Sequence, residues 1–443
     1  MTISRRNFLR SALAAICLPA GLVQRVKAET NKSVVLRFAA MSDVHFNKDH
    51  TPESPQRIRL AKAIQTMYSY SAQQAYPNFD ALAVAGDFSD HGIAEELYPF
   101  RDILDREMKP ETTRVLCMGN HEHYGGNREF FEETFGTKAN NHYVINGYHF
   151  ITIAPETGKC DVDQYLYIRD WLDAELKKAH EADPNRPSFV VQHYNVYNTI
   201  WGSADYPNEF HAGVKDLLGV IDQYPHVVHI SGHSHAPSFH PRSMWQGTFN
   251  AVGTGSMSYF GNYPEGLGKM RAADGVDRHQ AGTFLIFEVY EDQSILIKLY
   301  DTISDSFLDR EYLLIDPRDP ETYTYTDKRL DDAPAPAWPD GARLEVAETT
   351  AETAAINIPA ALDDYCVTFY TVTLEKENPE EGEKPRVVRF WSDYFMKNHA
   401  EQLKAVIDKL AAGTTYRVTV VGTNAFKKET PTALTGQFTT AEN

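Results

Sequence analysis

The chain has 443 residues, a hydrophobic content of 42% and a formal net charge of −18 at pH 7. This length and composition are sufficient for one large core and a second, smaller one, so we expect a soluble protein with more than one domain. The acidic charge and the lack of a basic run argue against a nucleic-acid partner or an anionic membrane surface, since both present phosphates.

The N-terminal segment resembles a twin-arginine export signal. Arg5 and Arg6 precede the apolar run "SALAAICLPAGLV", and small residues at the cleavage position end at Ala28. The run is too short for stable membrane insertion, and Ile16 occupies the position where a lipid-attachment signal has a small residue. An amphipathic helix is the alternative, but its polar face is missing. We expect residues 1–28 to be removed and the rest to be exported to the periplasm, the cell envelope or the medium.

Three cysteines follow this segment, at Cys117, Cys160 and Cys366, without any CxxC spacing. Cys117 lies within an apolar strand-like run, where a small buried side chain is expected. We therefore predict no disulfide framework, which agrees with export of a protein that has already folded in the reducing cytoplasm.

Strand-like runs alternate with helical patterns up to about residue 318. Strands are predicted for "VVLRFAAMS", "DALAVAGD", "RVLCMGN", "SFVVQH" and "VVHISGH", and helices for residues 59–70, 93–108, 164–180 and 214–222. Two hairpins are predicted, at residues 142–154 with a turn at Asn146 and Gly147, and between "GTFLIFEVY" and "SILIKLY". This alternation is typical of α/β folds, and we predict a two-sheet α/β sandwich flanked by helices over residues 29–318.

The sequence pattern changes after a Pro- and Ala-rich run, "DDAPAPAWPDG". This run indicates a semi-rigid linker over residues 319–341. Residues 342–443 contain β-type segments separated by turns. The run "LAAGTTYRVTVVGTN" resembles the tyrosine corner of fibronectin type III domains, with Tyr416 in place, although "AAINI" lacks the tryptophan that such domains usually bury. We predict a small all-β fibronectin type III-like sandwich here.

Five fragments place metal-binding side chain types directly after predicted strands: "SDVH", "GDFSD", "GNHE", "VVQH" and "GHSH". The side chains are Asp43, His45, Asp87, Asp90, Asn120, His121, His193, His233 and His235. Carboxylates, imidazoles and an amide suit Mn, Fe or Zn, and the absence of thiolates argues against a structural zinc site. Residues i and i+2 of an extended segment point the same way, so "DVH" and "HSH" should each offer two ligands to one side. Five such fragments in one chain disfavour the alternative interpretation, that these are isolated histidines in a core or on loops.

The order of these fragments resembles the calcineurin-like metallophosphoesterases over approximately residues 35–315. The resemblance implies two divalent metal ions, one held by Asp43, His45 and His235, the other by Asn120, His193 and His233, with Asp87 bridging them. It also implies that a bridging hydroxide attacks the phosphorus of a small phosphorylated substrate. His121 would then face the substrate as a proton donor or charge stabiliser. Asp90 would orient His121, or alternatively serve as a loop or cap carboxylate.

Departures from the family pattern narrow the substrate class. His91 stands where phosphoprotein phosphatases have arginine in "GDxxDRG", which disfavours that activity. Asp90 stands where purple acid phosphatases have tyrosine, and those enzymes lack a counterpart of His45. The forms "SDVH" and "GDFSD" are more similar to the bacterial branch that includes cyclic-nucleotide phosphodiesterases, whose members hydrolyse both phosphodiesters and phosphomonoesters.

Two questions remain open from the sequence. Tyr194, Trp201, Tyr259 and Phe260 lie in loops next to the predicted site, where aromatic rings either stack on a substrate or pack against their own scaffold. The C-terminal domain either is a spacer that contacts the cell envelope or shapes the active site. The alternative to an enzyme is a non-catalytic cell-surface binding or scaffolding protein with a vestigial fold, which is disfavoured because every predicted ligand is present.

Overall fold

The structure is a computed structural model that describes residues 32–442 except 160–162, 205–212, 262–269 and 280–281. The predicted export signal and Cys160 lie outside the described residues. Cys117 and Cys366 are buried and carry free thiols. Within the described part of the chain, none of the helices combines the length and the apolar character that a membrane crossing requires.

Two six-stranded sheets form the N-terminal part, in the strand orders β15-β14-β13-β1-β2-β3 and β10-β11-β9-β6-β5-β4. The first contains β1 (Val34–Met41), β2 (Ala81–Ala85), β3 (Thr113–Cys117), β13 (Thr283–Tyr290), β14 (Ile295–Asp301) and β15 (Ser306–Leu314). The second contains β4 (Asn141–Ile145), β5 (Tyr148–Ile153), β6 (Ser188–Gln192), β9 (Val227–Ser231), β10 (Met244–Gln246) and β11 (Asn250–Gly253). Their inner faces share one core, in which Phe38 stacks on Phe287 and lies edge-on to Phe150. The predicted two-sheet sandwich is confirmed.

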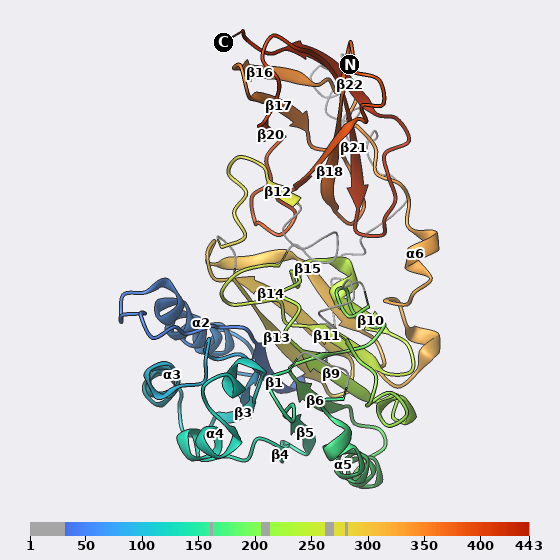
Figure 1. The fold of residues 1–443 in the computed structure, drawn as a ribbon. Coiled ribbons are helices and arrows are strands. Elements are labelled where there is room, and N and C mark those ends of the chain that lie inside the picture. Colours follow the sequence, from blue (N-terminus) through green and yellow to red (C-terminus); the bar gives the residue numbers. More distant parts are fainter. Residues whose placement is uncertain (1–31, 160–162, 205–212, 262–269, 280–281, 443) are drawn as a thin grey trace, which may run out of the picture.

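Helices cover the outer faces of both sheets (Figure 1). The first sheet is covered by α2 (Pro55–Ala72), α3 (Ala94–Glu107) and α4 (Arg128–Phe135), and the second by α5 (Arg169–Ala182). In α2 the buried residues include Leu60, Ile64 and Met67, which recur at the spacing of one helical face. The predictions of helices over residues 59–70, 93–108 and most of 164–180 are therefore confirmed.

The predicted helix over residues 214–222 is wrong. This segment forms the short strand β8 (Gly213–Val214), which pairs with β7 (Asn195–Val196), then turns and the 3₁₀ helix η3 (Ile221–Gln223). Asp216 Oδ2 accepts a hydrogen bond from the backbone nitrogen of Tyr165 at 2.7 Å, so its side chain is used for a long-range contact. Together with the low helix propensity of Gly219, such contacts outweigh the weak local pattern.

The predicted hairpin at residues 142–154 is confirmed. Strands β4 and β5 pair antiparallel up to Ile145 and Tyr148. The turn residues Asn146 and Gly147 have φ angles of 51° and 79°, the combination that a two-residue turn between twisted strands requires.

The C-terminal part is a β-sandwich, hereafter the C-terminal sandwich. One sheet contains β16 (Glu345–Thr349), β17 (Ala354–Pro359) and β20 (Gln402–Ile407), and the other contains β18 (Val367–Lys376), β19 (Arg386–Trp391), β21 (Thr415–Asn424) and β22 (Leu434–Thr439). Tyr416 Oη accepts a hydrogen bond from the backbone nitrogen of Ala411 at 3.0 Å, which is the contact of a tyrosine corner. The prediction of an all-β fibronectin type III-like sandwich is confirmed.

Two segments connect the C-terminal sandwich to the rest of the molecule (Figure 1). Strand β12 (Met270–Ala272), from the segment after "GHSH", pairs in parallel with β19 and extends the larger sheet of the sandwich. Residues 319–341, predicted as a linker, contain the 3₁₀ helix η5 (Pro320–Thr322) and the short helix α6 (Arg329–Asp332). Arg329 donates to the carbonyl oxygens of Pro241 and Met244 at 2.8 and 2.7 Å, so this segment packs against the N-terminal part.

Candidate metal centre

The predicted ligands lie on loops that directly follow five strands. Asp43 and His45 follow β1, Asp87 follows β2, Asn120 follows β3, His193 follows β6, and His233 and His235 follow β9. Strands β1 to β3 are parallel in the first sheet, and β6 and β9 are parallel in the second. Their carboxyl ends meet at one edge of the stacked sheets, which brings residues from distant parts of the chain together.

Five of the seven predicted ligands have a left-handed backbone. Their φ angles lie between 48° and 65°: Asp43, His45, Asp87, His233 and His235. Such a conformation is uncommon for residues other than glycine, costs on the order of 1–3 kcal/mol per residue, and is concentrated at functional sites. The prediction that extended backbone aims "DVH" and "HSH" is wrong, because β1 and β9 end before the ligands. Left-handed turns aim these side chains instead.

A buried carboxylate holds the two loops that follow β2 and β3. Glu122 accepts hydrogen bonds from the backbone nitrogens of Asp87, Phe88 and Gly119 at 3.0, 2.8 and 2.8 Å. Burial, reinforced by the neighbouring charge of Asp87, raises the pKa of Glu122 to about 7. The motifs alone assign no role to Glu122, although its position in "GNHE", beside predicted ligands, is a signal for one.

The first group of converging ligand atoms comes from Asp43, His45 and His235. His235 Nε2 lies 3.1 Å from Asp43 Oδ1 and 3.1 Å from His45 Nε2. All three side chains are buried. Ligand atoms from two loops that are far apart in the sequence, those after β1 and β9, thus converge on one small volume.

The second group comes from Asp87, His193 and His233. Asp87 Oδ2 lies 3.0 Å from His193 Nε2 and 3.9 Å from His45 Nε2, so its carboxylate stands between the two groups. Asn120 is 2% exposed, and the backbone nitrogen of the next residue, His121, donates to Asp87 Oδ1 at 3.0 Å, so the loop that carries Asn120 lies against the shared carboxylate. This is the arrangement expected of a shared carboxylate.

Hydrogen bonds on the far side of three imidazole rings orient them toward the site. The Nδ1 atoms of His45, His193 and His235 donate to Asp90 Oδ1 at 3.0 Å, to the Ala85 carbonyl at 2.7 Å and to the Tyr259 carbonyl at 2.9 Å. Each acceptor is an oxygen without a proton, so Nδ1 carries the hydrogen and Nε2 presents a lone pair in the neutral ring. Such outer contacts fix the orientation and raise the basicity of histidine ligands.

Burial and neighbouring charges set the protonation of the site. Burial lowers the pKa of His45, and it lowers that of His233 to about 3, so both rings are neutral at pH 7. Burial also disfavours the charged form of His193, but the facing Asp87 carboxylate outweighs this effect and raises the pKa to about 9. Conversely, His193 keeps the pKa of Asp87 well below its usual value despite burial.

The donor set fits divalent metal ions. Asn120 Oδ1 is buried and has no hydrogen-bond partner among the described residues. Buried polar atoms without partners are rare in proteins. An unpartnered amide oxygen next in sequence to converging imidazoles and carboxylates fits metal coordination.

The expected role of Asp90 has to be revised. Its backbone nitrogen donates to the Phe46 carbonyl at 2.8 Å, and this bond brings its carboxylate to His45 instead of His121. The other carboxylate oxygen accepts from Asn47 Nδ2 at 2.8 Å, so Asp90 also supports the loop. The Asp90 backbone carbonyl, not its carboxylate, lies 2.8 Å from His121 Nδ1 and orients that ring.

The four aromatic residues in the loops near the site were expected either to stack on a substrate or to pack against their own scaffold. Trp201 stacks on His240 at 4.2 Å, and Phe260 is fully buried in the core of the C-terminal sandwich, so these two pack against the scaffold. Tyr194 is fully buried too, but its ring centroid lies 4.3 Å from that of His233, edge-on to a predicted ligand. Tyr259 is half-buried, with its ring centroid 4.3 Å from His235 and 5.7 Å from His45, so it also lies beside the metal centre.

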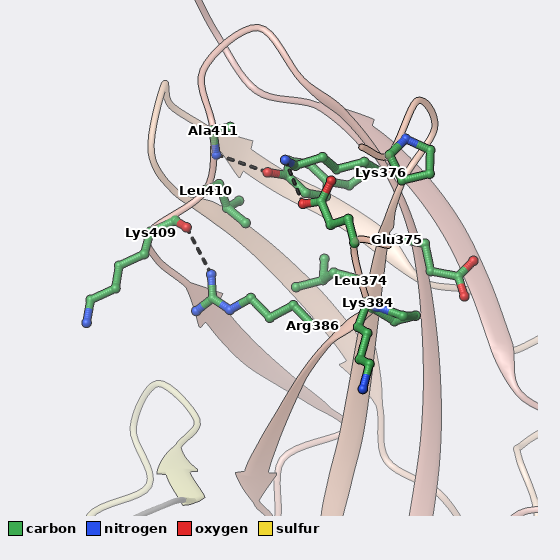
Figure 2. A pocket seen from close by; sticks show the side chains of 12 residues that line it. Leu374, Glu375, Lys376, Lys384, Arg386, Lys409, Leu410 and Ala411 are labelled. Atoms are coloured by element: carbon green, nitrogen blue, oxygen red, sulfur yellow. Dashed lines mark hydrogen bonds and ion pairs between the residues drawn. The ribbon is translucent and has the colours of Figure 1, made fainter. Parts of the chain in front are cut away.

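A pocket of about 400 Å³ lies on the C-terminal sandwich (Figure 2). Its lining includes Lys376, Lys384, Arg386 and Lys409, and none of the predicted site residues. Lys376 forms an ion pair with Glu383 at 2.7 Å, and Arg386 donates to the Lys409 carbonyl at 3.1 Å. Part of the positive charge is thus satisfied internally, and this pocket is separate from the metal centre.

Comparison with known proteins matches residues 36–237 to the calcineurin-like phosphoesterase family model. None of the curated proteins matches the chain. Similar solved structures include the fn3 domain of human collagen alpha-1(XX) chain, at 19% identity over 25% of this chain and 88% of that one, with a TM-score of 0.18. The fibronectin type-III domain of human fibronectin type III domain containing protein 3 has 18% identity, coverages of 25% and 91%, and a TM-score of 0.19. The family match and the metal-binding geometry identify residues 36–237 as a calcineurin-like phosphoesterase domain, a metal-dependent hydrolase of phosphoester bonds.

Proposed function

We propose that the chain is an exported enzyme that hydrolyses phosphodiester or phosphomonoester bonds with two divalent metal ions, chosen from Mn, Fe and Zn. The observation that carries this proposal is the pair of ligand groups that flank Asp87. One ion would be held by Asp43, His45 and His235 and the other by Asn120, His193 and His233. When bound, the two ions would supply a deprotonated water and neutralise the phosphoryl oxygens during in-line displacement.

His121 is positioned to serve the leaving group. Its side chain is 27% exposed, so a substrate can reach it, and its Nε2 lies 3.8 Å from Asp87 Oδ2 at the edge of the second ligand group. The bond between Nδ1 and the Asp90 carbonyl places a proton on Nδ1. In the imidazolium form Nε2 also carries a proton, which it can donate to the departing oxygen.

Replacing His121 tests this role through the leaving group. His121→Ala should lower kcat by about 10²- to 10⁴-fold for an alkyl phosphodiester, whose leaving oxygen needs a proton. The loss should be much smaller for a 4-nitrophenyl ester, because 4-nitrophenolate leaves without protonation. Steady-state kinetics on the two substrates would check this, with metal content measured beside them. Equal losses on both substrates would contradict proton donation by His121.

Asp90→Asn should weaken metal binding. The change removes the charged acceptor that holds His45 Nδ1, and the loss of such outer contacts typically costs about 10- to 100-fold in metal affinity. Calorimetric titration of the metal-free protein with Mn²⁺ would measure the effect, with the exposed Asp49→Asn as a matched control. Unchanged affinity in Asp90→Asn would show that His45 is held by its packing alone.

The export part of this proposal is supported by the sequence of residues 1–28, with Arg5 and Arg6 before an apolar run. A double Arg5→Lys, Arg6→Lys variant should accumulate inside the cell with its leader intact. Fractionation of cells that express either form, followed by immunoblotting, measures this. Equal export of both forms would contradict the twin-arginine route.

A further inference from the structure

We propose that the C-terminal sandwich is a positioning element of the metal centre, which it reaches through Phe260. Residues 259–261, hereafter the His235 clamp, contact His235 on one side and are anchored in the C-terminal sandwich on the other. The inference deepens the proposed function and rests on it, because it assigns the sandwich a role in metal binding at the same site.

The His235 clamp holds its histidine through two backbone hydrogen bonds. The Tyr259 carbonyl accepts from His235 Nδ1 at 2.9 Å, and the Gly261 nitrogen donates to the His235 carbonyl at 2.9 Å. The Tyr259 ring lies against the imidazole, with centroids 4.3 Å apart. The ring orientation, and with it the direction of the Nε2 lone pair, therefore depends on the position of the clamp.

Phe260, the central residue of the clamp, is anchored in the C-terminal sandwich. Its side chain is fully buried and belongs to the same hydrophobic core as the sandwich strands. Its ring centroid lies 5.5 Å from that of Phe395, which in turn contacts Trp391 at 5.4 Å. Because Phe260 stands between the two residues that bond His235, displacement of its ring would move both bonds.

The segment beyond the clamp is attached to the sandwich as well. Strand β12 pairs with β19, and Arg271 forms an ion pair with Asp408 at 2.6 Å. The backbone nitrogen of Asp274 donates to the Lys404 carbonyl at 2.7 Å. These contacts reach both sheets of the sandwich, so residues 270–274 are attached to it.

The segment before the clamp is held by the phosphoesterase domain. The Met257 nitrogen donates to the Ser42 carbonyl at 3.1 Å, and Ser256 Oγ donates to the Asp43 carbonyl at 3.1 Å. The clamp is thus held at its start by one domain and at the Phe260 ring by the other, and the Phe260 nitrogen also donates to the Arg278 carbonyl at 3.0 Å. Removal of the anchor should loosen residues 259–261 while leaving Asp43 and the second ligand group in place.

The test uses the full chain and three alanine variants. Phe260→Ala and Phe395→Ala remove the anchor from either side, and Phe438→Ala is the matched control. Phe438 is 5% exposed in the same core, but its ring contacts Tyr416 at the tyrosine corner. Two-site calorimetric titration of the metal-free proteins with Mn²⁺ measures the affinities, and kinetics on a chromogenic phosphodiester measures kcat and KM.

The anchor variants should bind one of the two ions about 10-fold more weakly and the other unchanged, whereas Phe438→Ala should match the wild type at both sites. Phe260→Leu, which retains an apolar anchor, should recover most of the loss. If Phe260→Ala does not fold, Phe395→Ala against Phe438→Ala gives the same comparison. Anchor variants that match the control overturn this inference while leaving the phosphoesterase intact. A wild type without metal or activity overturns the proposed function itself.

Discussion

Asp87→Asn is expected to reduce hydrolysis by at least about 10³-fold, because it removes the carboxylate that lies between the two ligand groups. Asp87 Oδ2 lies 3.0 Å from His193 Nε2 and 3.9 Å from His45 Nε2. The amide of asparagine keeps the shape of the side chain but loses the negative charge that would attract the metal ions. Metal ions contribute several kcal/mol of transition-state stabilisation, and each 1.4 kcal/mol corresponds to about tenfold in rate. Steady-state kinetics of the protein reconstituted with Mn²⁺ would measure the loss.

The control for this substitution is Asp49→Asn, the same chemical change on an exposed loop residue next to the site. It should retain the activity of the wild type. Hydrolysis by Asp87→Asn within tenfold of the wild type, or activity that persists after chelation of divalent ions, would contradict the mechanism.

Glu122→Ala is expected to have the largest effect on stability, lowering the free energy of unfolding by about 3–5 kcal/mol. The Glu122 carboxylate accepts hydrogen bonds from three backbone nitrogens, of Asp87, Phe88 and Gly119, and a fourth from Ser89 at 3.2 Å. An alanine would leave these donors buried without an acceptor, and each unsatisfied group costs about 1–3 kcal/mol before any relaxation or entry of water. The loops that carry Asp87 and Asn120 would lose their common support.

Urea unfolding followed by tryptophan fluorescence would measure this change, with the exposed Glu129→Ala as the matched control. The free energy of unfolding of Glu122→Gln should be intermediate, because the amide oxygen can accept some of these hydrogen bonds whereas the NH₂ group faces further donors. A Glu122→Ala variant as stable as the control would mean that the two loops are held by their packing.

Local patterns in the sequence predicted the elements that have a clear signal. The strands in "DALAVAGD" and "VVHISGH" were predicted because each is a short, nearly continuous apolar run, and the helix over residues 59–70 because its apolar residues recur on one helical face. The hairpin turn was predicted because Asn-Gly between two strand-like runs favours a tight turn. Residues 214–222 failed because Asp216 is committed to a contact with Tyr165, which is distant in sequence.

The side chains of the site were named from motifs, and the structure brings the eight carboxylates and imidazoles among them together. The direction of these side chains was attributed to an extended backbone, which is wrong. The left-handed φ angles at residues such as Asp43 and His233 cannot be inferred from strand alternation. The contact of Asp90 with His45 depends on a backbone bond to Phe46 between two loops. The anchoring of Phe260 in the C-terminal sandwich is a contact between residues 260 and 395 that no local pattern encodes.

A crystal structure of the protein reconstituted with Mn²⁺, with anomalous difference density measured at the metal absorption edge, tests the two-metal centre most directly. Two peaks about 3.5–4 Å apart are expected. One peak should lie among Asp43, His45 and His235, the other among Asn120, His193 and His233, with Asp87 between them. A single peak, or two peaks without Asp87 between them, would contradict the two-metal centre.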